Sequence, residues 1–76
     1  MRYVMLTQEN CKYCTAALGL LNSHGYKVTL YDVSERHSNS TVAALIVTET
    51  VPQIYDPDGQ FIGGYTELKE HLDGTA

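Results

Sequence analysis

Hydrophobic residues in the first half of the chain follow a strand pattern, then a helix pattern, then a strand pattern again. A short apolar run predicts a buried strand from Arg2 to Leu6, and a polar loop follows at 7–10. The next apolar positions have helical spacing and predict a helix that ends near Gly25; they are Cys14, Ala17, Leu18 and Leu21. Residues 27–33 are rich in β-branched side chains and predict a second strand. Together these elements predict a right-handed βαβ unit with parallel strands.

The middle of the chain carries weaker signals. Residues 34–40 are polar and predict a loop that runs into a helix start. Residues 41–47 predict a short helix, although their β-branched side chains lower the helix propensity. A third strand is predicted at 51–55 and is entered through Pro52.

The last third of the chain predicts a hairpin followed by a helix. The turn sequence Pro57-Asp58-Gly59 predicts that a fourth strand at 60–62 returns antiparallel to the third. Gly63-Gly64 ends this strand, and Thr66 is the predicted N-cap of a final helix. Leu68 and Leu72 form the apolar side of that helix. The predicted order is β-α-β-α-β-β-α, with no internal repeat and no linker.

Composition narrows the class of protein. Seventy-six residues, 43% of them hydrophobic and 18% charged, predict one globular domain over 1–76. No apolar run approaches the roughly 20 residues of a membrane span. The chain starts directly with a strand pattern, so no signal peptide is expected and the predicted location is cytoplasmic. A net charge of −4 and a pI near 5.1 argue against nucleic-acid binding.

Two cysteines, Cys11 and Cys14, lie where the first predicted strand gives way to the first predicted helix. Side chains at this spacing on a helix lie about 5–6 Å apart between Cβ atoms, while a disulfide needs about 3.5–4.5 Å. If the first cysteine occupies the unwound edge of the helix, a small adjustment lets the bond open and close reversibly. In a reducing compartment, a lone pair of this kind is typical of catalysis rather than structure.

Cys11 is the predicted nucleophile. Asn10 is a suitable N-cap, which puts Cys11 at the first helical position, beside unsatisfied N–H groups and the positive end of the helix dipole. These groups and the charge of Lys12 favour the thiolate, which is the attacking species. Cys14 lies one turn further on, on the apolar side of the helix, and is the predicted resolving thiol.

Two structural interpretations compete with the catalytic one. A structural zinc site needs four ligands, and the chain has no third cysteine. The histidines, His24, His37 and His71, lack the paired spacing of a zinc finger, so no metal site is expected. A structural disulfide between residues this close would close a very small loop and constrain the chain little.

Three short motifs, at these separations, resemble those of the glutaredoxin family. They are Cys11-Lys12-Tyr13-Cys14, Thr50-Val51-Pro52 and Gly63-Gly64-Tyr65-Thr66-Glu67-Leu68. The resemblance covers nearly the whole chain, and the stretch from Pro57 to Leu72 is similar to the small glutaredoxins of bacteriophages. The CxxC motif alone is shared with thioredoxins, whereas the other two motifs are far more specific.

The resemblance implies an α/β, thioredoxin-like fold, in which a four-stranded mixed sheet carries helices on both faces. It implies a cis peptide bond before Pro52, which turns the Val51 backbone toward a bound cysteinyl peptide for strand-like pairing. It also implies that N–H groups at the start of the last helix bind the γ-glutamyl carboxylate of glutathione. The implied glutathione-binding residues are Lys12, Tyr13, Thr50, Val51, Pro52, Gly64, Tyr65 and Thr66. From the residues alone, Tyr13 equally suits the core and Thr66 equally suits a plain N-cap.

The sequence departs from the family pattern near the cysteines. Many glutaredoxins have a lysine where Gln8 stands, a proline where Lys12 stands and an aspartate where Thr66 stands. Glu49 occupies a position that is often basic or neutral. The missing cation at Gln8 and the added anion at Glu49 should weaken capture of the glycine carboxylate of glutathione. Lys12 is the predicted replacement for that charge.

The predicted function is reduction of protein disulfides and glutathione mixed disulfides by the Cys11–Cys14 pair, with glutathione as co-substrate and reductant. Expected partners are glutathione and protein disulfides, such as that of a ribonucleotide reductase, with no nucleic acid and no membrane. A monomer is expected, in the host cytoplasm if the source is a bacteriophage. Two alternatives stay open. One is a redoxin reduced by a flavoprotein reductase. The other is a module in which two protomers hold an iron–sulfur cluster through the N-terminal cysteine and glutathione.

Overall fold

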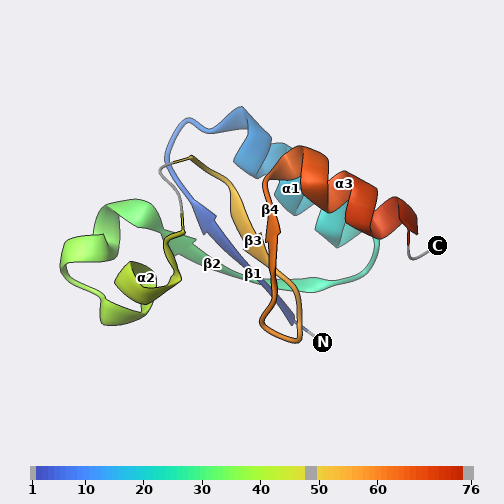
Figure 1. Cartoon of the computed structure of the whole chain (residues 1–76). Coiled ribbons are helices and arrows are strands. Elements are labelled where there is room, and N and C mark those ends of the chain that lie inside the picture. Colours follow the sequence, from blue (N-terminus) through green and yellow to red (C-terminus); the bar gives the residue numbers. More distant parts are fainter. Residues whose placement is uncertain (1, 48–49, 75–76) are drawn as a thin grey trace.

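The structure is a computed structural model that describes residues 2–47 and 50–74. Its elements, shown in Figure 1, confirm the predicted order β-α-β-α-β-β-α. In chain order they are β1 (Arg2–Thr7), α1 (Lys12–Ser23), β2 (Lys27–Asp32), the 3-10 helix η1 (Val33–His37), α2 (Ser40–Leu45), β3 (Gln53–Tyr55), β4 (Phe61–Gly63) and α3 (Tyr65–Gly74). The short helix η1 lies where the polar composition predicts a loop, and β3 is shorter than predicted because it begins after Pro52.

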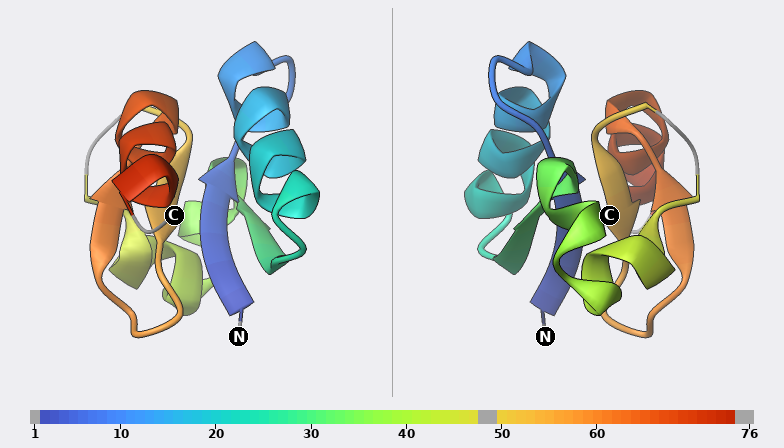
Figure 2. Two further views of the ribbon diagram at one scale, coloured as in Figure 1. Left: turned by 90° about the vertical axis from the view of Figure 1, so that its right-hand side faces the viewer. Right: turned by 90° about the vertical axis from the view of Figure 1, so that its left-hand side faces the viewer.

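The four strands form one mixed sheet in the order β2-β1-β3-β4. β1 pairs parallel to β2, as the βαβ pattern predicts, and antiparallel to β3. β3 and β4 form the predicted antiparallel hairpin. Figure 1 shows α1 and α3 together on one side of the sheet, while η1 and α2 lie on the other side. Figure 2 shows the same layers from both ends.

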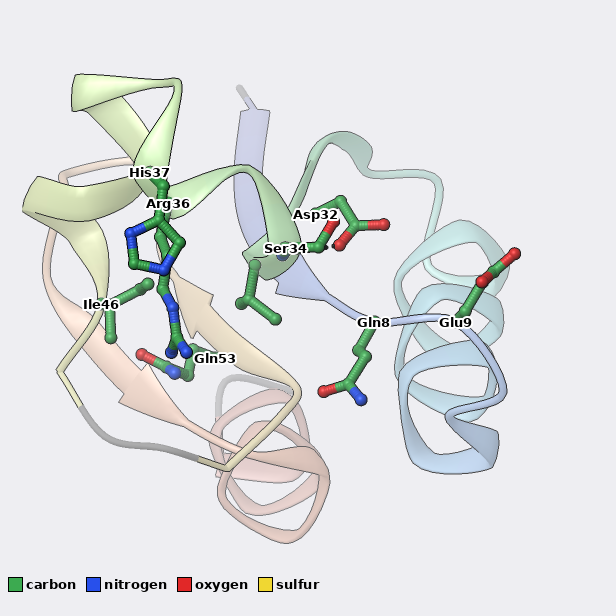
Figure 3. A pocket seen from close by; sticks show the side chains of 9 residues that line it. Gln8, Glu9, Asp32, Ser34, Arg36, His37, Ile46 and Gln53 are labelled. Atoms are coloured by element: carbon green, nitrogen blue, oxygen red, sulfur yellow. Dashed lines mark hydrogen bonds between the residues drawn. The ribbon is translucent and has the colours of Figure 1, made fainter.

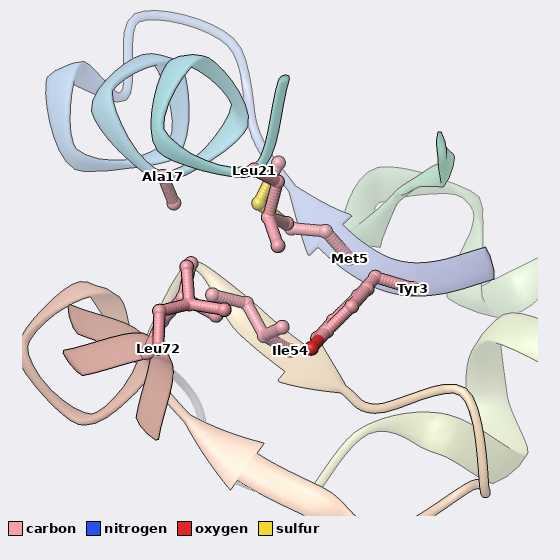
Figure 4. Close-up of a cluster of buried hydrophobic side chains, with 7 residues drawn as sticks. Tyr3, Met5, Ala17, Leu21, Ile54 and Leu72 are labelled. Atoms are coloured by element: carbon pink, nitrogen blue, oxygen red, sulfur yellow. The ribbon is translucent and has the colours of Figure 1, made fainter. Parts of the chain in front are cut away.

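The main core lies between the sheet and the helices α1 and α3 (Figure 4). Its members are all at most 4% exposed: Tyr3, Met5, Ala17, Leu21, Ile54, Leu68 and Leu72. Full burial of one leucine or methionine stabilises a fold by about 1.5–3 kcal/mol. This core therefore fixes the central strand β1, and with it the position from which the cysteine loop departs.

Helix α1 ends at Ser23, and Gly25 follows its C-cap with a φ of 79°, as predicted. The Gly25 N–H donates to the Asn22 carbonyl at 3.0 Å, and the Tyr26 N–H donates to the Leu21 carbonyl at 3.1 Å. This pair of bonds is the Schellman motif, which needs a left-handed residue where glycine stands. The motif turns the chain directly into β2 and so fixes the length of α1.

The opposite face of the sheet has a smaller buried layer. Leu6 of β1 and Val42 of α2 are fully buried, and so is Gln53, which pairs with Leu6 in the β1–β3 register. Tyr55 lies two residues beyond Gln53, on the same face of β3. Its hydroxyl donates to the Leu45 carbonyl at the end of α2. The Tyr55 side chain thus holds the end of α2 against the sheet. Within 2–47 and 50–74, no helix has the length and apolarity to cross a membrane.

Candidate active site

Cys11 lies at the boundary between the loop after β1 and helix α1. Asn10 has a φ of 59°, a left-handed conformation that asparagine tolerates better than most residues. The helix begins at Lys12, and Cys11 is its N-cap, with φ −101° and ψ 102°. The predicted N-cap at Asn10 is therefore wrong by one residue. Asn10 makes the left-handed turn, and the sulfur of Cys11 does the capping.

The sulfur of Cys11 faces the N-terminal N–H groups of α1. It accepts a hydrogen bond from the Cys14 N–H at 3.1 Å, and the Cys11 carbonyl accepts one from the Thr15 N–H at 3.2 Å. Cys11 and Cys14 form a disulfide, with their Cα atoms 5.2 Å apart. Donors and the helix dipole at this end favour negative charge on the Cys11 sulfur once the bond is reduced.

The two sulfurs differ in access. Cys14 lies on the core side of α1 and is only 4% exposed, whereas Cys11 is half-buried at the edge of the helix. A bulky disulfide can therefore approach Cys11 but not Cys14. Once a mixed disulfide has formed at Cys11, Cys14 is close enough to attack it.

The Val51–Pro52 segment lies directly against Cys11. Its peptide bond is cis, as the resemblance implies, and the Val51 carbonyl oxygen lies 4.0 Å from the Cys11 sulfur. Pro52 is buried, Val51 is half-buried and Thr50 is exposed. The Thr50–Val51 main chain therefore borders the redox centre on its open side.

The Gly63-Gly64 motif brings the start of α3 to the same place. Gly63 has a φ of 129°, which only glycine adopts readily. A Cβ added to Gly64 would lie 3.6 Å from the Pro52 carbonyl oxygen, so the two backbones are neighbours. The Gly64 N–H donates to Glu67 Oε1 at 2.8 Å. Helix α3 begins at Tyr65, so the predicted N-cap at Thr66 is wrong. Glu67 reaches back to the residue before the helix, as in half of a capping box.

Two tyrosines join the first and third motifs. The ring centroids of Tyr13 and Tyr65 are 6.2 Å apart, and the Lys12 Nζ lies 5.7 Å from the centroid of the Tyr13 ring. Tyr13 is 56% exposed, which rules out the core-facing alternative. The three motifs, distant in sequence, are therefore neighbours: Val51 borders Cys11, Gly64 borders Pro52 and Tyr65 borders Tyr13.

The family model described as Glutaredoxin matches residues 3–62, which include the cysteine pair and the Thr50-Val51-Pro52 motif. The chain belongs to the glutaredoxin family. A search of curated proteins found no match. The family's thioredoxin-like fold agrees with the four-stranded mixed sheet and its helices, so the predicted fold is confirmed. The similarity to bacteriophage glutaredoxins stays a prediction.

Solved glutaredoxin structures are similar over almost the whole chain. Reduced Escherichia coli glutaredoxin is 30% identical with a TM-score of 0.61, and the match covers 96% of this chain and 99% of that one. Glutaredoxin 1 from Francisella tularensis, complexed with cacodylate, is 27% identical with a TM-score of 0.69, over 97% and 94%. A buckwheat glutaredoxin–glutathione complex is 22% identical with a TM-score of 0.71, over 95% and 69%, and shows a likeness of fold.

Gln8, one of the departures from glutaredoxin sequences, is exposed and lines two cavities. The first, of about 530 Å³, is lined by Cys11 and Lys12 among others. The second, of about 620 Å³, lies beside η1 and Ile46 and is drawn in Figure 3. It brings Arg36 and His37 within the same cavity as Gln8. Glu49, the other charge departure, lies outside the described residues.

The cavity in Figure 3 has lining groups of both charges. Asp32 and Glu9 are the acids, while Arg36 and His37 are the bases. The Ser34 N–H donates to Asp32 Oδ1 at 2.8 Å and holds the pKa of that carboxyl below its usual value. The carboxylate of Asp32 is thus ionised near neutral pH and offsets part of the positive charge.

Sequence reasoning missed two residues that shape the site, Gln53 and Glu67. Gln53 is a buried amide in an otherwise apolar strand, and Glu67 stands three residues after Gly64. A polar residue directly after a proline and inside the Gln53–Tyr55 strand was the available signal for the first. The capping-box spacing was the signal for the second. In the part of the chain that the structure describes, no group of three or more His, Cys, Asp and Glu side chains could hold a metal ion.

Proposed function

We propose that this glutaredoxin is a dithiol thiol–disulfide oxidoreductase. The Cys11 thiolate attacks one sulfur of a substrate disulfide, forms a mixed disulfide and releases the other sulfur as a thiolate, which takes up a proton. Cys14 then loses its proton and attacks the Cys11 sulfur, which releases the reduced substrate and leaves the Cys11–Cys14 disulfide. The observation that carries this proposal is the disulfide at the N-terminus of α1, with one sulfur accessible and the other buried.

Glutathione is the proposed reductant and co-substrate. Two glutathione molecules would reduce the Cys11–Cys14 disulfide by successive attack and leave as glutathione disulfide. The family and the fold shared with a glutathione-bound glutaredoxin from buckwheat support this choice. The proposed contacts surround Cys11 and comprise Lys12, Tyr13, Thr50, Val51, Pro52, Gly64, Tyr65 and Thr66.

The contacts divide into two physical roles. The main chain of Val51 beside Cys11 suits strand-like pairing with a cysteinyl backbone. The start of α3 offers N–H groups to the γ-glutamyl carboxylate. Because the Gly64 N–H already donates to Glu67, the N–H groups of Tyr65 and Thr66 are the proposed donors.

A second source of electrons is a flavoprotein reductase. The observation that favours it is the exposed, uncharged Gln8 in place of the lysine of many glutaredoxins, since this removes a cation that would attract glutathione. The same cysteine chemistry serves both reductants. Only the donor that reduces the Cys11–Cys14 disulfide differs.

Protein disulfides are the proposed physiological substrates, and that of a ribonucleotide reductase is one candidate. We further propose that the chain acts as a monomer in the cytoplasm. A small half-buried redox centre that needs no second chain for its two thiols supports the monomer.

The test is turnover of a protein disulfide with a single electron source. One reaction contains glutathione, glutathione reductase and NADPH, and the other contains thioredoxin reductase and NADPH. The proposal predicts turnover in the first and little in the second. The reverse pattern would keep the oxidoreductase assignment and replace glutathione by a flavoprotein reductase, while no turnover in either would contradict the assignment.

A further inference from the structure

Gln53 is a buried polar side chain two residues after Val51, whose carbonyl borders the Cys11 sulfur. It is 1% exposed and lies at the start of β3, directly after Pro52. Its side chain lies on the face of the sheet opposite the main core, because the neighbouring Ile54 belongs to that core. Figure 3 shows it reaching from β3 toward Ile46, the residue that follows α2.

The carboxamide of Gln53 bonds to Val47 and to Thr50. Its Oε1 accepts the Val47 N–H at 2.8 Å, and its Nε2 donates to the Thr50 carbonyl at 3.0 Å. A single side chain therefore ties together both ends of the segment that links α2 to Val51. The carboxamide end of both bonds is buried, and an unmet amide group in such a place costs about 1–3 kcal/mol.

The anchor itself is firmly held. Gln53 pairs with Leu6 in the β1–β3 ladder, and Leu6 is fully buried. On the same face of β3, the Tyr55 hydroxyl donates to Leu45 at the end of α2. The position of Thr50 is thus set by bonds to the sheet, and Val51, next in the chain, is the residue whose carbonyl lies 4.0 Å from the Cys11 sulfur.

We propose that Gln53 is a positioning residue for substrate binding. Its carboxamide fixes the Thr50–Val51 main chain at the distance from Cys11 that lets a cysteinyl backbone pair with it while its sulfur meets Cys11. In this role Gln53 acts through the Thr50–Val51 main chain and not through the substrate itself. The kinetic test of this inference rests on the proposed function. Loss of the Gln53 carboxamide should also displace the Thr50–Val51 main chain, and this displacement does not depend on that function.

The first test replaces Gln53 by methionine, which keeps the length and removes the carboxamide that bonds to Val47 and Thr50. For Gln53→Met we expect the KM for a glutathione mixed disulfide to rise about ten-fold, the equivalent of one buried hydrogen bond, with kcat little changed. Alkylation of reduced Cys11 by iodoacetamide needs no backbone pairing and should keep its rate. Gln60→Met, the same change at an exposed position, is the matched control and should alter neither quantity.

A second variant separates positioning from a general loss of structure. In Gln53→Glu, the protonated acid can still accept from Val47 and donate to Thr50, whereas the ionised form cannot donate. Burial would raise the pKa of such a carboxyl group, whereas Arg36 and His37, which line the same cavity, would lower it, so the KM is compared over the whole pH range in which the protein stays folded. The KM of Gln53→Glu relative to the wild type should therefore be near one at low pH and increase as the pH rises.

The outcomes are distinguishable. An unchanged KM in Gln53→Met would overturn the inference. A slower alkylation of Cys11 in that variant would overturn it as well. If the wild type itself turns over no glutathione substrate, the proposed function fails, and amide NMR of the oxidised protein decides the inference. Gln53→Met should then shift the Val51 amide resonance and speed hydrogen exchange at Val47, while Gln60→Met should do neither. A Val51 resonance that stays in place would overturn the inference on its own.

Discussion

The sulfur of Cys11 accepts the N–H of Cys14 at 3.1 Å, so the first cysteine of the motif caps the helix that carries the second. A capping atom is stabilised most when it is negatively charged, because it faces unpaired N–H groups and the positive end of the helix dipole. The same contact therefore links the local fold of α1 to the reactivity of the thiol.

From this contact we predict that Cys11 in the reduced protein has a pKa below that of a free cysteine, about 8.5. The measurement is thiolate absorbance near 240 nm against pH in the Cys14→Ser variant, where Cys11 is the only thiol, with the tyrosine contribution subtracted by means of a variant that lacks both thiols. The Cys11→Ser variant shows how Cys14 alone behaves in its buried position. A Cys11 midpoint at or above the free value would mean that the capping geometry does not stabilise the thiolate.

A second prediction concerns the charge departures. If Lys12 replaces the cation missing at Gln8, Lys12→Ala should raise the KM for glutathione substrates more than for substrates that lack the glycine carboxylate. An exposed pair contributes only about 0.2–1 kcal/mol, so the increase should be a few-fold and should shrink with added salt. Assays must be run at a pH where Cys11 is fully ionised in both proteins.

The control for this experiment is Lys27→Ala, which removes an exposed lysine at the start of β2. It changes the net charge equally but lies at the end of the sheet away from Cys11, since Lys27 pairs with Arg2. An effect confined to Lys12→Ala supports the replacement. Equal KM values for Lys12→Ala and the wild type would mean that the carboxylate is held elsewhere, with Arg36 as the next residue to test, or that glutathione is not the ligand.

A third prediction tests the backbone conformation of α1. Gly19 is an exposed position inside the helix, and a Cβ added there meets nothing within 4 Å. Gly19→Ala should therefore raise the free energy of unfolding by about 0.5–1 kcal/mol. Gly25 also has open space around it, but its φ is 79°, so Gly25→Ala should lower the free energy of unfolding by about 1–2 kcal/mol.

Urea unfolding of the oxidised proteins measures both changes against the wild type. Because the two substitutions add the same methyl group, opposite signs isolate the conformational requirement at Gly25. Two changes of the same sign would contradict the left-handed end of α1.

Much of the fold follows from local sequence patterns. Helix α1 and the turn at Gly25 could be predicted because the apolar spacing and the glycine agree. The 3-10 helix η1 could not, because its residues 33–37 have no buried side chain and so leave no periodic signal. The N-cap positions were missed because several adjacent residues suit a cap. The choice between them depends on the tertiary path of the chain around Asn10 and Gly64.

The redox pair was evident from the sequence, but the support around it was not. Cys11 and Cys14 are marked by their spacing alone. Gln53 and Glu67 act through hydrogen bonds to main-chain groups, and such bonds leave only a weak trace in the sequence. Their roles become visible once the sheet register brings Gln53 next to the segment that follows α2.

The central claim is that Cys11 attacks the substrate and Cys14 resolves the intermediate, and replacing each thiol by serine tests it most directly. Cys11→Ser should abolish reduction of both protein disulfides and glutathione mixed disulfides, because the accessible nucleophile is gone. Cys14→Ser should lose reduction of protein disulfides but keep reduction of glutathione mixed disulfides, because glutathione can resolve the intermediate at Cys11. Rates for both variants on both substrates, measured with glutathione and glutathione reductase, decide the question. The account predicts that, of the two variants, only Cys14→Ser retains reduction of glutathione mixed disulfides. Equal loss of both activities in both variants would contradict the account.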